Sequence, residues 1–285
     1  MSRSASIAAG LRTISTRYIG RRTLQDRLQR ATLADSGYLT LTSTLKFART
    51  FFDGHNLATG WEVSKRQSDE HVMRRDRLSG AEETMVDERF EPEVRRLAAF
   101  AQDEWSVTKQ WSLYLGARWE KIATDSSGTG IPSSSSRSQV LSPVAQSLYK
   151  FPDKSGRQVR VALTRTYKAP EPGQLSARRY IASLNTRFSP DSIGNPALKP
   201  ELASGIDLTY EHFWAPSALF SVAFGARRIT DYIRSQRDQD DNGQWFDQPV
   251  NSGRAHVRTL DVEAKFPLKA VWTAAASVDV RASEP

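Results

Sequence analysis

The sequence predicts an all-β fold, an antiparallel transmembrane β-barrel segment of about 10–12 strands. Two observations predict it: apolar residues recur at every second position, and the connections between these alternating segments are short and long in turn. No stretch approaches the roughly 18 consecutive apolar residues of a membrane-spanning helix, whereas a barrel strand is apolar only on alternate residues.

The alternation is clearest between residues 111 and 120. One face carries Trp111, Leu113, Leu115, Ala117 and Trp119, and the other carries Ser112, Tyr114, Gly116, Arg118 and Glu120. A helix would spread these side chains around its axis, whereas a strand separates them. Segments at 39–47, 57–64, 159–168, 206–211, 220–224 and 260–263 repeat the pattern.

The alternation assigns side chains to faces. We predict that the lipid-facing, convex face carries Leu113, Leu115, Val161, Leu163, Leu208 and Val222, and that the inner face carries Arg118, Glu120, Arg160 and Glu211. Tyr167 falls on the apolar face, as does Arg165, near the end of its strand. Asp103 shares the apolar face with Trp105, and the sequence offers no account of it.

The predicted connections alternate in length from residue 37 onward. Short ones lie near 50–54, 108–110, 153–156, 214–217 and 267–269, and long ones at 66–91, 124–138, 169–200 and 235–248. Outer-membrane barrels place short periplasmic turns at one end and long extracellular loops at the other. Aromatic residues flank the short turns, as in the girdles of such barrels: Phe51, Phe52, Trp111, Phe151, Phe213, Trp214, Phe266 and Trp272.

The composition excludes several classes of function. The formal charge is +8, yet no run of Lys or Arg exceeds two residues, so no nucleic-acid partner is expected. There are no cysteines, and the four histidines have no metal-ligand spacing. Phosphate-loop, dinucleotide-binding and nucleophile-elbow motifs are also missing. We therefore expect no enzyme activity, no catalytic residues, no metal site and no cofactor.

One loop resembles half of a calcium-binding loop. Residues 238–243 read D-x-D-x-N-G, but the ligating glutamate expected at the twelfth position falls on Pro249. A hairpin turn at Asn242-Gly243 is the preferred interpretation, and calcium remains the alternative.

Several phrases in order along the chain resemble the barrel of TonB-dependent receptors. They are AFAQDEW at 99–105, WSLYLGAR at 111–118, LSP at 141–143, VALTRTYKAP at 161–170, NPALKPE at 195–201, YE at 210–211, ITDYI at 229–233 and NSGRA at 251–255. The chain departs from the family at Thr259-Leu-Asp261, where a Gly-x-Glu is usual. The two prolines of NPALKPE also predict a straightened loop before a strand that begins at Glu201.

The resemblance implies uptake of a scarce nutrient across the outer membrane, energised through TonB. A ferric siderophore is the expected ligand, with haem, cobalamin and saccharides as alternatives. Such receptors have a 22-stranded barrel, a plug and a TonB box. Because about half of that number of strands turns about half of the circumference, the resemblance implies that this β-barrel segment is an open, incomplete barrel. We expect residues 1–285 to be a partial barrel domain, in which the strand pattern is less clear over residues 1–36. Contact with TonB is expected only through a plug missing from this chain.

Ligand-binding candidates lie in the long loops. The loop at 169–200 carries Arg178, Arg179, Tyr180 and Arg187. In or beside the loop at 235–248 lie Arg234, Arg237 and Trp245. Arginine makes directional hydrogen bonds with anions, which suits a ferric chelate. Outer-membrane lipid and the phosphates of lipopolysaccharide are further expected partners of such loops.

Two other hypotheses remain open. A passive pore or translocator barrel of about 12 strands would require the strand before Ala34 to pair with the last strand, at residues 271–283. A soluble, sugar-binding β-sandwich is disfavoured because it has no reason to gather its long loops at one end.

Overall fold

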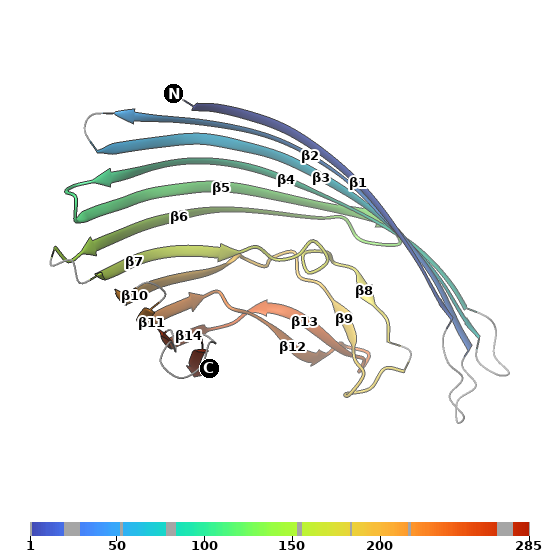
Figure 1. Cartoon of the computed structure of the whole chain (residues 1–285). Helices are drawn as coiled ribbons and strands as arrows, with labels where there is room; N and C mark the ends of the chain where they lie inside the picture. Colours follow the sequence, from blue (N-terminus) through green and yellow to red (C-terminus); the bar gives the residue numbers. More distant parts are fainter. Residues whose placement is uncertain are drawn as a thin grey trace.

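The computed structural model describes the backbone of residues 2–19, 29–51, 54–77, 84–152, 156–182, 184–215, 218–266 and 276–284. Side chains are described from residue 33 to 266 within those ranges, apart from residues 76, 77 and 84. The described chain forms one large curved sheet and a small four-stranded sheet (Figure 1). It contains no helix that is long and apolar enough to cross a membrane.

The large sheet has eleven strands in the order β1-β2-β3-β4-β5-β6-β7-β10-β11-β14-β15, and neighbouring strands are antiparallel throughout. The strands are β1 (Ser2–Ile19), β2 (Gln29–Phe51), β3 (His55–Arg77), β4 (Thr84–Ser106), β5 (Trp111–Thr129), β6 (Ser134–Lys150), β7 (Arg157–Lys168), β10 (Glu201–Ala215), β11 (Ala218–Thr230), β14 (Arg254–Phe266) and β15 (Ala276–Glu284). The predicted strand number and antiparallel meander are confirmed.

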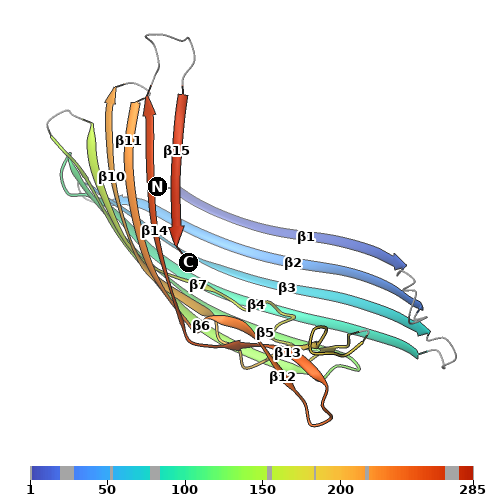
Figure 2. The same cartoon turned by 90° about the horizontal axis from the view of Figure 1, so that it is seen from below.

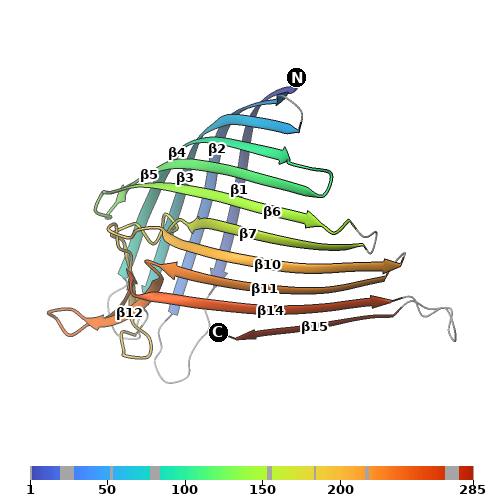
Figure 3. The same cartoon turned by 90° about the vertical axis from the view of Figure 1, so that its left-hand side faces the viewer.

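The large sheet is open. Within the described residues, β1 pairs only with β2 and β15 pairs only with β14. Figure 2 shows the two edge strands diverging, and in Figure 3 the chain termini lie on opposite margins of the sheet. The predicted open barrel is therefore confirmed, and the described residues of β1 and β15 do not form the ladder on which a closed twelve-stranded pore depends.

The two faces of the sheet carry opposite chemistry. Cross-strand register places Leu115, Ala145, Leu163 and Ile206 in one row of the convex face. Leu115 is 51% exposed and Leu163 is 53% exposed. A soluble sandwich would bury such residues, whereas an outer-membrane sheet presents them to lipid. The outward prediction for the six apolar residues is confirmed by the same continuous registers.

The concave face is polar and partly covered. Arg118 donates hydrogen bonds to Glu62 at 3.1 Å and to Glu120 at 3.3 Å, and Glu120 is only 6% exposed. Gln158 donates to Glu211 at 2.6 Å on the same face. The inward prediction for Arg118, Glu120, Arg160 and Glu211 is confirmed by their registers.

The structure accounts for Asp103. Its Oδ2 pairs with Nδ1 of His55 at 2.7 Å, and the His55 ring stacks on Trp105 with ring centroids 4.9 Å apart. The group lies beside the short turns, where a charged side chain on the lipid face costs about 0–1 kcal/mol rather than the midplane penalty.

Tyr167 corrects the alternation pattern. Its side chain makes a hydrogen bond with Glu120 and therefore reaches the concave face, not the convex one. Pairing between β6 and β7 ends at Val144 and Thr164, after which β7 is paired with β10 alone. The pairing of β7 with β10 continues without a register shift to Lys168, so the period of two is kept. The end of β7, no longer held beside β6, brings the Tyr167 side chain to Glu120.

Two predicted long loops are largely strand. β3 and β4 continue to Arg77 and from Thr84, through the predicted loop at 66–91, and β5 and β6 reduce the loop at 124–138 to residues 130–133. These extensions have polar residues on both faces, as expected where both faces meet water. Alternation disappears there although the hydrogen-bonded ladder continues, which is why the sequence pattern predicted loops.

Aromatic residues border the short-turn end of the convex face. Trp111 and Tyr149 are direct cross-strand partners, and both are exposed, as are Phe213 and Trp214. Phe51, Phe151 and Phe266 end or follow strands at that end. Phe52, Trp272 and the predicted turn at 267–269 lie outside the described residues.

Candidate ligand-binding rim

A small sheet lies on the concave side of the large one, near its long-connection end (Figure 1). Its order is β12-β13-β9-β8, with β8 (Arg179–Tyr180), β9 (Asp191–Ile193), β12 (Ile233–Gln239) and β13 (Trp245–Asn251). β8 and β9 come from the predicted loop at 169–200, and β12 and β13 form a hairpin from the second predicted loop. β13 and β9 pair in parallel over two residues, the one parallel contact among the described strands. We call these two segments, residues 169–200 and 231–253, the rim.

The NPALKPE phrase joins the two rim segments. Asn195 Nδ2 donates to the carbonyl of Pro249 at 3.1 Å. Asn251 accepts from the backbone N–H of Lys199 at 2.8 Å and donates to its carbonyl at 2.9 Å. β10 then begins at Glu201, whose carboxylate accepts from the N–H of Ile233 at 2.7 Å. The phrase is architectural, as its prolines predicted.

Arg178 attaches the rim to the wall of the large sheet. It is 3% exposed, and its Nη2 and Nε donate to Glu88 Oε2 at 2.7 and 3.0 Å. The guanidinium lies 4.3 Å from the ring centre of Tyr180 and 5.8 Å from that of Phe90. Because a buried charge is tolerated only when it is paired, this side chain is a structural anchor.

Arg179 connects the two rim segments. Its Nε donates to Asp191 Oδ2 at 2.8 Å, and its Nη1 donates to Asp240 Oδ2 at 2.7 Å. Burial raises the pKa of Asp191, but hydrogen bonds from Ala182, Asn185 and Arg179 outweigh burial and hold this pKa below its ordinary value. The hydrogen bonds from Arg179 and from the backbone of Gln244 lower the pKa of Asp240.

Asp240 also closes the tip of the β12–β13 hairpin. Its Oδ1 accepts from the backbone N–H of Asn242 at 3.0 Å and of Gln244 at 2.9 Å, and Gly243 has a positive φ of 74°. The hairpin-turn interpretation of residues 238–243 is therefore confirmed. No group of three or more acidic or histidine side chains in the described part of the chain is arranged to hold a metal ion.

Arg237 is also engaged. It forms a two-pronged pair with Asp247, with both N–O distances at 2.8 Å, and donates to the carbonyl of Arg187 at 2.7 Å. Trp245 is clamped by Asn185, which exchanges two hydrogen bonds of 2.8 Å with its backbone. The Arg187 guanidinium lies over the Trp245 ring at 5.7 Å.

The predicted ligand-binding residues therefore divide into two groups. Arg178, Arg179 and Arg237 have carboxylate partners. Among the described side chains, Arg187 and Arg234 have no carboxylate partner, and both are exposed. Tyr180 is 43% exposed, and its hydroxyl accepts from Arg178 at 3.3 Å. Arg187, Trp245 and Arg237 are brought together, while no contact joins Arg234 to them.

The sequence pattern missed an apolar group on the rim. Ile181, Leu184 and Phe188 are 54%, 66% and 92% exposed. Phe188 lies in the turn closed by the bridge between Thr186 and Ser189. Apolar residues isolated in a polar loop are the sequence signal that could have found them, because no regular alternation assigns them to a buried or lipid-facing side of a strand.

Comparison with known proteins gives the family. The family model described as TonB dependent receptor-like, beta-barrel, matches residues 3–284. No curated protein sequence matches the chain.

Similar solved structures agree with the fold. The copper transporter OprC has a TM-score of 0.65 at 12% identity, over 84% of this chain and 37% of its own. The unliganded ferric citrate transporter FecA has a TM-score of 0.61 at 12% identity, and the match covers 95% of this chain and 37% of that structure. The closed form of the ferric-catecholate import receptor Fiu from K12 E. coli has a TM-score of 0.59 at 12% identity, and the match covers 98% of this chain and 45% of that structure.

This chain thus spans less than half the length of those three structures. The likeness of fold agrees with the open sheet, the apolar convex face and the family match. The chain belongs to the TonB-dependent receptor-like β-barrel family, whose members are outer-membrane transport receptors.

Proposed function

We propose that the chain forms the wall and part of the extracellular rim of a receptor that imports a small anionic chelate, a ferric siderophore above all, with energy supplied through TonB. The observation that carries the proposal is the rim itself. Two long segments are fastened to each other and to the concave wall, and they leave Arg187 without a carboxylate partner beside Trp245.

The chemistry of this arrangement suits an anion with an extended ring or chelate surface. Arg187 offers directional donors, and the Trp245 ring supplies an aromatic surface held in place by Asn185. Arg234 and Tyr180 are exposed on the same rim and complete the candidate set. Arg178, Arg179 and Arg237 act in this proposal by positioning the loops.

In this proposal, the coupling of ligand binding to TonB is the role of a plug. Coupling to TonB requires a segment that occupies the concave side, and the polar network of Glu62, Arg118 and Glu120 offers it charged partners. The convex face contacts outer-membrane lipid and lipopolysaccharide in this proposal. We expect this chain alone to bind the chelate without transporting it.

A binding experiment tests the proposal. The full chain in outer-membrane vesicles is titrated with ferric citrate and with a ferric tris-catecholate, and quenching of tryptophan fluorescence is measured. The Arg187→Ala and Trp245→Ala variants should weaken binding by at least tenfold. Lys109→Ala, an exposed cation beside a short turn at the opposite end, is the matched control and should bind normally. Equal binding by all variants would place the ligand elsewhere.

A further inference from the structure

A gap opens between β6 and the strand that follows it in the large sheet. β6 pairs with β5 along its length, but its pairing with β7 ends at Val144, so residues 135–143 have a strand on one side only. Figure 1 shows β6 continuing beyond the end of β7, with the rim below it in this view. A pocket of about 430 Å³ lies there, which we call the β6 gap. It is lined by residues 135–140 of β6, residues 196–200 of the rim, Leu202 and Asp231.

Pro143 explains where the pairing of β6 with β7 ends. The backbone N–H of Lys150 donates to the carbonyl of Gln110 beside β5, and that of Phe151 donates to the carbonyl of Arg157 in β7. Because the backbone groups of successive strand residues point to opposite neighbours and the register of β6 is continuous, its odd-numbered residues face β7. Pro143 is the first of these beyond the last β6–β7 pair, and it has no N–H to donate. The ladder therefore stops at this proline.

The rest of this edge of β6 is unpaired. Leu141, Gln139, Arg137 and Ser135 each direct a backbone N–H and C=O into the gap, and no described residue forms a hydrogen bond with these backbone groups. The opposite wall cannot complete the ladder, because the two prolines of NPALKPE lack an N–H. The three N–H groups between those prolines are already bonded to asparagine oxygens of the rim.

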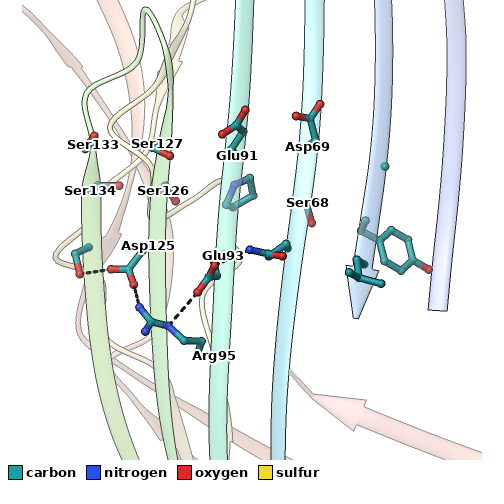
Figure 4. Close-up of a pocket in the computed structure, with 16 residues that line it drawn as sticks. Ser68, Asp69, Glu91, Glu93, Arg95, Asp125, Ser126, Ser127, Ser133 and Ser134 are labelled. Atoms are coloured by element: carbon teal, nitrogen blue, oxygen red, sulfur yellow. Dashed lines mark hydrogen bonds and ion pairs between the residues drawn. The ribbon is translucent and has the colours of Figure 1, made fainter. Parts of the chain in front are cut away.

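The gap lies beyond the lipid-facing band. Leu141 is 50% exposed, and the next three residues on the convex face of β6 are polar. Asp125 of β5 holds this end of β6, because it accepts from Ser135 Oγ at 2.7 Å and pairs with Arg137 at 3.6 Å and with Arg95 of β4 (Figure 4). An unpaired edge is very unfavourable in hydrocarbon, whereas at this level water reaches it and a ligand can displace that water.

The pocket beside the edge offers sites for an apolar and a charged side chain. Val140 and Leu198 form buried walls and are 5% and 4% exposed. The carboxylate of Asp231 lines the same pocket and makes no hydrogen bond or ion pair with any described residue. Asp231 has a φ of 55°, and Asn251 Nδ2 donates to its carbonyl at 2.7 Å, which fixes the residue in place. A basic side chain would supply the partner that this carboxylate lacks.

The repeat of the edge identifies the ligand class. Its N–H and C=O pairs recur at every second residue, about 7 Å apart. An extended peptide presents acceptors and donors at the same spacing, whereas a sugar, a lipid head group or a phosphate does not. In strand addition the backbone bonds supply the affinity and alternate side chains enter pockets. Asp231 and Lys199 are the unpaired charges of the lining, and because they are opposite in sign they favour a peptide of low net charge.

We propose that the β6 gap binds an extended peptide segment of a partner by strand addition. The peptide pairs with the gap-facing backbone of residues 135–141, places an apolar side chain against Val140 and Leu198, and places a basic one beside Asp231. This role is separate from chelate binding at the rim. It gives the wall a site for a protein partner rather than for the transported ligand.

A binding experiment with a synthetic strand tests the proposal. The full chain in phosphatidylcholine vesicles is titrated with the fluorescein-labelled heptapeptide KVTVTVE, which is long enough to face residues 135–141, and fluorescence anisotropy is measured. The same heptapeptide with every backbone nitrogen methylated is the control ligand, because it keeps the side chains and loses the donors. We expect the unmodified peptide to bind at least tenfold more tightly. Equal affinities, or no binding of the unmodified peptide at millimolar concentration, would overturn the proposal.

Hydrogen exchange of single amides locates the contact. With the peptide bound, the gap-facing amides of Leu141, Gln139 and Arg137 should exchange at least tenfold more slowly. The amides of Ser138 and Val140 face β5 and should change little. Protection of alternate residues is the signature of strand addition, so equal protection of both sets contradicts it.

Two variants separate the backbone contact from the carboxylate contact. Gln139→Pro removes one gap-facing donor without breaking a bond to β5, so it should weaken peptide binding by at least tenfold. Continued protection of the Ser138 and Val140 amides reports that this variant is folded. Asp231→Asn keeps a residue type that tolerates a positive φ, and it should weaken binding of KVTVTVE but not of a peptide with norleucine in place of lysine. Asp241→Asn, an exposed carboxylate at the tip of the β12–β13 hairpin, is the matched control and should bind normally.

The outcomes of these variants are distinct. Unchanged affinity in Gln139→Pro overturns pairing with β6, and unchanged affinity in Asp231→Asn overturns the assignment of the basic side chain. The Arg187→Ala variant should bind the peptide normally, so failure of chelate binding at the rim and failure of peptide binding at the gap are distinguishable.

Discussion

Arg178 illustrates how a charged loop residue becomes structural. Its sequence context, Arg178-Arg179-Tyr180 in a polar loop, predicts an exposed anion-binding group. The fold instead encloses it between Phe90 and Tyr180 and pairs it with Glu88, which lies 90 positions earlier in the chain. Glu88 belongs to a stretch predicted as loop, so this partnership was invisible to the sequence pattern.

Removing the Arg178 side chain should release the rim from the wall. We expect Arg178→Ala to destabilise this attachment by about 1.5–3 kcal/mol, because the charged hydrogen bonds to Glu88 are lost and the carboxylate is left unpaired. Hydrogen exchange across residues 178–193 should rise accordingly. Arg178→Lys keeps the charge but not the planar two-pronged geometry, and it should give an intermediate effect. A rim as protected as in the parent chain would show that Arg178 is not the anchor.

The carboxylates around Arg179 predict how the rim responds to acid. The pKa values of Asp191 and Asp240 both lie below their ordinary value of 3.8. A lowered pKa contributes stability that is present above the unfolded-state pKa and is lost as pH falls through the folded-state pKa. The junction between the two rim segments should therefore be unchanged from pH 8 to pH 5 and should open below about pH 3.8. Hydrogen exchange of residues 185–193, corrected for its intrinsic pH dependence, measures this, and Arg179→Gln should remove the transition.

At the scale of strands, period-two alternation predicts the strands whose outer face must be apolar because it contacts lipid. Wherever one face meets lipid, as from Leu113 to Trp119, the pattern gives the correct strand and the correct face. It fails beyond the membrane, where the polar halves of β3 and β4 continue as strands held by their neighbours rather than by an apolar face. It also fails at Tyr167, where one neighbouring strand departs.

Two adjacent residues of β7 provide a test of the face assignment. Leu163 faces outward and Thr164 faces inward. Leu163→Arg places a charge in the lipid-facing band and should be unfavourable by about 2–4 kcal/mol if that position lies at the midplane. Thr164→Arg, on the polar concave face, should have a much smaller effect. Urea titration of the chain inserted into lipid vesicles compares them, and equal effects would show that the two faces are not distinct.

At the scale of the whole molecule, the two unpaired edges of the large sheet determine how the isolated chain behaves. β1 and β15 each present an unpaired ladder within the described sheet, and every unsatisfied backbone group in hydrocarbon costs several kcal/mol. The isolated chain should therefore insert as oligomers that pair through these edges rather than as a monomer. Sedimentation in detergent should show oligomers or aggregates.

A crosslinking experiment distinguishes open from closed sheets. The chain has no cysteine, so cysteines introduced at Ala9 in β1 and Val280 in β15 would be the only thiols. We expect no intramolecular disulfide between them, because the two edge strands lie on opposite margins (Figure 3). A monomeric disulfide formed in high yield would indicate a self-sufficient barrel and would favour the passive-pore hypothesis.

The open architecture was predictable because curvature is inherited from strand number: a stretch resembling part of a 22-stranded wall turns only part of the way round. The rim was not, because its sheet is built from segments separated by long loops and held by individual pairs such as Arg179–Asp240. Such pairings depend on the tertiary arrangement of distant segments, which local periodicity does not predict. The interruption of the β3–β4 pairing beside Pro92 could not be predicted either, since it is evident only once β3 and β4 are known to be neighbours.

β2, β3 and β4 are each 23 residues long, whereas a strand crosses the hydrocarbon core with about 9–11 residues. The remaining residues of β3 and β4 continue as a hydrogen-bonded pair of strands beyond the length that crosses the hydrocarbon core. We expect sequence change in these strand ends to alter the outer surface of the protein without altering the residues proposed to hold the ligand.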